Sequence, residues 1–236
     1  MKNWTKTIAT GALMVLVAIS MAQGQGGGGG RQGGGQRMGG RGGGMGSPAS
    51  LINRADVQKD LAITDDQKTK LKDLQAKQME EMQAQRQAGG GGGGGGFDRE
   101  AMMKAMKERQ EKNEKAVNEI LTPEQQKRLK EIYVQLAGGS AILNEGIQKD
   151  LELTDDQKTK IKDLQTKQQE ANAELRTKMQ NQEIDRQQMQ DIQKKNNDAL
   201  KEELIKVLTA DQAAKFKAMA GKEFKADPPA GGGGGN

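Results

Sequence analysis

The chain has 236 residues, of which 29% are charged and 2% aromatic, and its formal net charge is +5. It contains no cysteine and no histidine, which excludes disulfides, thiol nucleophiles, imidazole bases and metal sites built from thiolate or imidazole. No pair of carboxylates stands out as a converging acid and base. The sequence therefore predicts a protein that is not an enzyme and has no cofactor or metal site. Modest charge and few aromatic side chains argue against nucleic-acid binding.

The first 22 residues have the layout of a secretory signal peptide. Lys2 and Lys6 precede an apolar run over 8–19, and the small residues Ser20 and Ala22 stand at the −3 and −1 positions of a cleavage site. The apolar run is shorter than the ~20 residues that a membrane-spanning helix needs. We expect export to the periplasm, or secretion, with no stable membrane insertion after cleavage.

Glycine is concentrated in three tracts. Residues 24–46, 89–96 and 231–235 hold 28 of the 33 glycines. Such tracts cannot bury enough apolar surface to offset the entropy of ordering, so disorder is predicted over 23–48 and in the tail 227–236. The middle tract predicts a flexible loop. The composition between the tracts, rich in Lys, Gln, Glu, Asp, Leu and Met, is typical of long solvated helices.

The remaining sequence is an internal repeat. Residues 58–78 and 148–168 are identical at 17 of 21 positions. A second match, between 120–130 and 207–217, has nearly the same offset. The repeat predicts two units, 49–137 with the loop 89–96 and 141–226, joined at Gly138 and Gly139.

Each unit is predicted to hold four helical segments and no strand, because no stretch alternates with period two. The first segment is short, and the second and third form a long antiparallel hairpin. The third opens at Asp98 or Asp185, either of which can cap a helix. In the second unit the fourth segment carries Phe216, Met219, Ala220 and Phe224. The predicted fold is all-α.

Four Thr-x-x-Gln motifs recur, each after a leucine or isoleucine. They are Thr64 with Gln67, Thr122 with Gln125, Thr154 with Gln157, and Thr209 with Gln212. This is the capping-box spacing, in which the threonine oxygen accepts from the third backbone N–H and the glutamine reaches back to the threonine N–H. We interpret the motifs as four helix starts, each contributing about 1 kcal/mol, rather than as ligand sites.

Paired Leu-Thr-x-x-Gln motifs in a small, exported, helical chain resemble the LTXXQ-motif family, the Spy/CpxP-like periplasmic proteins. The resemblance covers 49–226. It implies four-helix protomers that pair into a thin, curved cradle and act as ATP-independent chaperones or envelope-stress modulators. Since this chain carries two pairs of motifs, its two units are candidates for a pseudo-dimeric cradle within one chain, and the choice between monomer and dimer stays open. The metal-resistance branch of the family uses histidines, which this chain lacks.

Methionines mark the candidate client-binding surface. Five of them fall on the second and third helices of the first unit: Met79, Met82, Met102, Met103 and Met106. A flexible, polarizable side chain suits weak binding of many partners, and the interspersed lysines would attract acidic clients. The sequence thus favours a chaperone-like protein that binds unfolded or partly folded envelope proteins. The same methionines could instead pack the hairpin core.

Two other functions fit the sequence less well. One is a non-catalytic regulatory or structural module that binds a single envelope partner, such as a stress sensor, through helix packing. The other is a copper binder, because Met79/Met82 and Met103/Met106 are Met-x-x-Met pairs and thioether sulfur suits Cu(I). Neither pair has a histidine or cysteine beside it.

Overall fold

The computed structural model describes residues 47–88 and 99–227, and the side chains over 47–84 and 104–227. Every regular element in these ranges is a helix, which confirms the all-α class. The predicted signal peptide, the glycine tracts and the cap at Asp98 lie outside the described residues. None of the helices in the described part combines the length and apolarity needed to cross a membrane.

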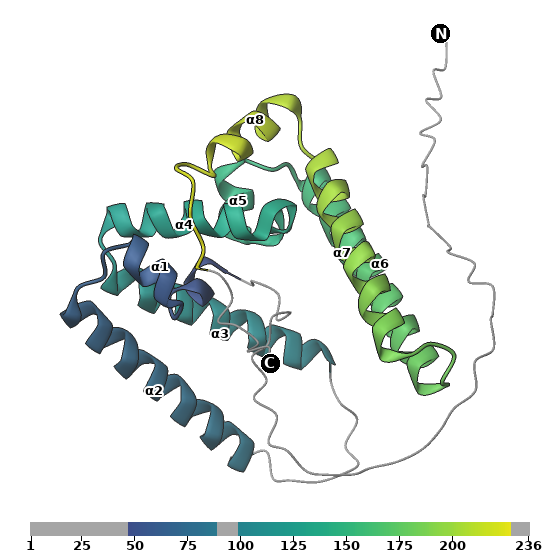
Figure 1. Ribbon diagram of the computed structural model, residues 1–236, viewed down its shortest axis with the longest axis horizontal. Coiled ribbons are helices and arrows are strands. Elements are labelled where there is room, and N and C mark those ends of the chain that lie inside the picture. Colours follow the sequence, from purple (N-terminus) through teal and green to yellow (C-terminus); the bar gives the residue numbers. More distant parts are fainter. Residues whose placement is uncertain (1–46, 89–98, 228–236) are drawn as a thin grey trace, which may run out of the picture. The chain divides into compact units, whose positions relative to one another are not determined.

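The element order of the first half recurs in the second half (Figure 1). With η for 3-10 helices, the elements are η1 (Pro48–Leu51), α1 (Ala55–Asp60), α2 (Asp65–Ala88), α3 (Arg99–Ile120), α4 (Pro123–Ala137), η2 (Gly138–Leu143), α5 (Glu145–Asp150), α6 (Asp155–Gln180), α7 (Arg186–Lys206) and α8 (Ala210–Ala218). Each short first segment is therefore a 3-10 turn followed by a six-residue α-helix. Asn144 separates the two by capping α5, where its side chain accepts from Ile147 N over 3.1 Å.

The long helices form two antiparallel hairpins, α2 with α3 and α6 with α7. Gln67 Nε2 donates to Ile120 O over 2.9 Å, and Gln78 Nε2 donates to Asn113 Oδ1 over 2.7 Å. The later residue of α2, Gln78, thus bonds to the earlier residue of α3, Asn113, so the two helices run in opposite directions. The corresponding pairs in the second hairpin are Gln157 with Val207 and Gln168 with Asn197. Figure 1 shows α6 and α7 side by side.

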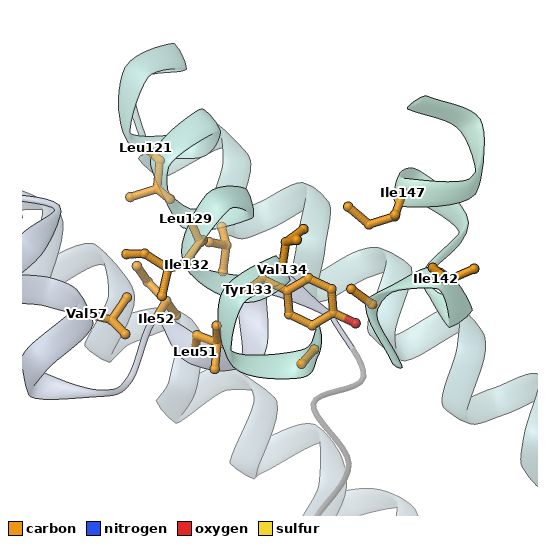
Figure 2. Packing of buried hydrophobic residues seen from close by; sticks show 14 of the residues in the cluster. Leu51, Ile52, Val57, Leu121, Leu129, Ile132, Tyr133, Val134, Ile142 and Ile147 are labelled. Carbon is orange, nitrogen blue, oxygen red and sulfur yellow. The ribbon is translucent and has the colours of Figure 1, made fainter. Parts of the chain in front are cut away.

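One hydrophobic core lies at the bases of both hairpins. Its centre is α4, from which Leu129, Ile132 and Tyr133 are at most 1% exposed. The 3-10 turns η1 and η2 both pack on α4, so residues from both halves of the repeat meet in the same cluster. Figure 2 shows Leu51 of η1 and Ile142 of η2 within it. The hairpins therefore extend from a shared base rather than from separate cores.

Gly139, at the predicted join of the two units, is buried where η2 approaches α7. A Cβ atom at this position would overlap the backbone carbonyl of Lys201. The approach of the two elements therefore requires glycine, because a carbonyl inside a helix cannot move aside without breaking its hydrogen bond.

We expect Gly139→Ala to lower the free energy of unfolding by about 1–3 kcal/mol, the usual cost of overpacking. Ser140→Ala, at the half-exposed neighbouring position, is the matched control and should stay within about 0.5 kcal/mol of the parent. Urea unfolding followed by circular dichroism measures both. Equal stability of the two variants would show that η2 can move away from α7 at no cost.

Tyr133, the only tyrosine of the chain, reports on the core through its ionisation. Burial, together with the charge of Glu114, raises its pKa from 10.0 to about 12. The phenol is therefore held protonated in the folded state. Because the unfolded chain ionises at lower pH, folding keeps the full benefit of the neutral phenol below pH about 10 and loses it progressively toward about 12.

Tyrosinate absorbance should accordingly rise near pH 12 in the native chain and near pH 10 in urea. The free energy of unfolding should fall across the same interval. A native titration that coincides with the one in urea would mean that the Tyr133 side chain is open to solvent.

The last helix is shorter than the sequence predicts. α8 ends at Ala218, and Gly221 turns the chain with φ +58, a backbone conformation that favours glycine. The prediction that Phe224 shares a helix with Phe216 is therefore wrong. Phe224 instead lies on residues 221–227, here called the strap, which leave α8 and run beside α4 (Figure 1).

Candidate functional site

All four Thr-x-x-Gln motifs form capping boxes. At the start of α4, Thr122 Oγ1 accepts from Gln125 N over 3.3 Å, and Thr122 N donates to Gln125 Oε1 over 3.0 Å. The same two hydrogen bonds occur at the starts of α2, α6 and α8. Asp185 forms an equivalent box with Gln188 at the start of α7, as its position in the sequence predicts.

The motifs also bind one another in pairs. Gln67 Nε2 donates to Gln125 Oε1 over 2.7 Å, and Gln125 Nε2 donates back to Gln67 Oε1 over 3.0 Å. Each amide donates in addition to a backbone carbonyl, Gln67 to Ile120 O over 2.9 Å and Gln125 to Leu61 O over 3.1 Å. Gln157 and Gln212 repeat the arrangement, with amide–amide distances of 2.6 and 3.1 Å.

This pairing explains the choice of glutamine. A capping box is satisfied by glutamate or glutamine, because only the side-chain oxygen is used. The second role needs an N–H₂ group, which a carboxylate lacks. Each glutamine therefore caps its own helix with its oxygen and binds the partner motif with its nitrogen. The sequence predicts the caps but not the pairs, although glutamine at all four positions is a signal that could have indicated them.

Gln67→Glu keeps the local cap but places a carboxylate opposite Ile120 O and Gln125 Oε1, two acceptors that lose the Gln67 amide as a donor. We expect it to lower the free energy of unfolding by about 1–3 kcal/mol. Relative to the parent, the loss should shrink at acid pH, where the protonated carboxyl can donate again.

Gln188→Glu is the matched control, because Gln188 accepts from Asp185 N over 2.9 Å in the same kind of box but pairs with no second motif in the described part of the chain. Its effect should be close to zero, since a negative charge is favourable at a helix start. Urea unfolding at neutral and acid pH measures both variants. Equal destabilisation by the two changes would contradict a special role for the pair.

The exposed methionines of the hairpins, here called the methionine surface, lie apart from the paired glutamines. In the described residues the exposed large hydrophobic side chains all lie on hairpin helices: Met79 (55% exposed), Met82 (39%), Met106 (46%), Met179 (38%) and Ile205 (42%). The sequence singles out the first three. It misses Met179, which stands alone among polar residues, and Ile205, which directly follows the buried Leu204. Met102 and Met103 lie on α3, but their side chains are outside the described part.

Met82 and Met106 lie toward the outer end of the first hairpin. Met82 follows Gln78 by one helical turn, and Met106 precedes Asn113 by two, so both lie beyond the Gln78–Asn113 hydrogen bond on the sides where α2 and α3 meet. In the second hairpin, Leu175 occupies this outer region and is 6% exposed. The corresponding position of α2 is Gln85. The first hairpin therefore lacks this buried leucine beside its methionines.

A groove beside α3 and the start of α5 is lined mainly by carboxylates, among them Glu111, Glu114, Glu119 and Glu145. Burial raises the pKa of Glu114, and the charge of Lys130 opposes the rise. Glu145 is engaged by Lys107 over 2.6 Å. No group of three or more Asp, Glu, Cys or His side chains in the described residues is arranged to hold a metal ion.

The chain matches no protein-family model, no curated protein and no solved structure. Its function is therefore inferred from the two features above, the tied hairpin bases and the exposed methionines toward the hairpin ends.

Proposed function

We propose that the chain is an exported, ATP-independent chaperone-like protein that binds unfolded or partly folded envelope proteins on its hairpins. The observation that carries the proposal is the position of the exposed apolar side chains. All of those described, from Met79 to Ile205, lie on the four hairpin helices, and the core residues of the base are buried. An exposed apolar surface of this kind is typical of an interaction site.

The chemistry of this surface suits weak and reversible binding. Full burial of a methionine side chain contributes about 1.5–3 kcal/mol, so partial burial of a few gives modest affinity. The unbranched thioether adapts to irregular clients. Exposed lysines lie close by on α2 and α3, among them Lys77 and Lys104. They add a salt-sensitive attraction for acidic client segments.

The resemblance to LTXXQ-motif proteins supports the same function and a periplasmic location, and we propose membership of that family. The glutamine pairs give the Thr-x-x-Gln motif a structural role in this function. By tying α2 to α4 and α6 to α8 at their starts, they hold the hairpin bases together without any contact to a client. Client binding then falls to side chains farther along the helices.

The test is light scattering of an aggregating client with the chain from Gln23 onward and no nucleotide. We expect suppression that saturates near equimolar ratios. Replacing Met79, Met82 and Met106 together by glutamine, a good helix former, should raise the amount of chain needed by roughly ten-fold, which corresponds to about 1.4 kcal/mol of lost binding.

The matched control replaces three exposed alanines of the same helices by glutamine, namely Ala76, Ala84 and Ala105. It adds the same side chains without removing a thioether and should suppress aggregation like the parent. Unchanged client aggregation at several-fold excess of the parent chain would overturn the proposal and favour a module with one dedicated envelope partner.

A further inference from the structure

The strap, residues 221–227, is held to α4 through its backbone. Gln135 Nε2 donates to the carbonyl of Ala220, just before the strap, and to that of Lys222 over 2.7 Å. Gln135 Oε1 accepts from Phe224 N over 2.7 Å. One glutamine side chain thus binds a backbone N–H and backbone carbonyls of an extended segment. A neighbouring β-strand would bind the same kinds of group.

Two charged side chains add to this recognition. Arg128 donates to Lys222 O over 2.6 Å and to Glu223 O over 3.4 Å. Asp56 of α1 accepts from Asp227 N over 3.2 Å. Residues 228 and 229 are prolines, which have no N–H to donate. Asp227 therefore supplies the last backbone donor of the strap before the prolines.

Both charged groups are anchored independently of the strap. Arg128 Nε and Nη2 donate to the two carboxylate oxygens of Asp60 over 2.7 and 3.1 Å, and Nη1 donates to Glu131. Asp56 is paired with Arg54. Arg128 and Asp56 are thus fixed by their own neighbours, so these two groups stay in place when the strap leaves.

The strap has one side chain that is partly buried. Phe224 is partly buried against the core, and the other strap residues are exposed. The site therefore recognises extended backbone plus one large apolar side chain. Of the charged side chains of the strap, Asp227 adds a coulombic attraction to Arg54.

We propose that this face of α4 and α1 is a binding site for an extended polypeptide segment carrying an aromatic residue, and that the strap occupies it in cis. The site lies apart from the methionine surface and does not depend on the chaperone proposal. A covalently attached segment acts at an effective concentration in the millimolar range, so the strap blocks weak peptides. A peptide occupies the site only if it binds more tightly than the strap, or if the contacts of the strap are weakened.

The test uses the full chain from Gln23 and a fluorescent peptide with the sequence of residues 220–228. In the parent chain we expect little binding by fluorescence anisotropy. Phe224→Ala, which removes the apolar anchor of the strap, should tighten peptide binding by about ten-fold or more, because loss of an aromatic anchor weakens the competing cis contact. Lys225→Ala, an exposed strap position, is the matched control and should behave like the parent.

Two further measurements separate a real site from general loosening. In the Phe224→Ala background, adding Gln135→Ala should abolish the gain, and a peptide whose phenylalanine is replaced by alanine should fail to bind. In the parent chain, a large excess of peptide over the anisotropy concentrations should speed hydrogen exchange at the Phe224 amide by competing with the strap for Gln135. Circular dichroism checks that each variant is folded.

The proposal is overturned if the Phe224→Ala chain binds the peptide no better than the parent does. It is equally overturned if Gln135→Ala leaves the gain intact. A doubling of molecular mass without peptide binding would also overturn it, and would instead indicate exchange of straps between two copies of the chain.

Discussion

The reciprocal hydrogen bonds between paired glutamines are the interaction on which the hairpins depend. Each pair joins helix starts that are 58 or 55 residues apart in the sequence. Each amide also binds a backbone carbonyl at the end of another helix, such as Ile120 O. With so few aromatic residues the chain has a small core, and these pairs satisfy polar groups beside it that would otherwise be costly to bury.

Because the bases are tied, the outer parts of the hairpins can be polar and thinly packed. Leu175 and Ile161 are buried in α6, whereas Leu71 in the base half is the only fully buried side chain described on α2. Helices with little apolar contact keep their methionines exposed. The division between a packed base and open ends is the structural basis of the proposed client binding.

The central helix α4 unites the rest of the molecule. Its buried side supplies Leu129, Ile132 and Tyr133 to the core, between η1 and η2. Its polar side, through Arg128 and Gln135, receives the strap. The C-terminal part of the second half is thereby bound to the first half, which a reading of the repeat as two separate units does not anticipate. Substitutions on α4 are therefore expected to affect both halves of the chain.

The sequence by itself determined the helical class, the repeat and the helix starts. These follow from local rules, since a cap such as Thr122 with Gln125 involves residues three apart. Tertiary structure decided which caps pair, which methionines stay exposed and where Phe224 lies. The last was predicted wrongly because apolar spacing extends the helix pattern through Gly221, whereas Gln135, 89 residues earlier, binds the Phe224 N–H. Contacts over such separations depend on how the helices pack, and no local pattern records them.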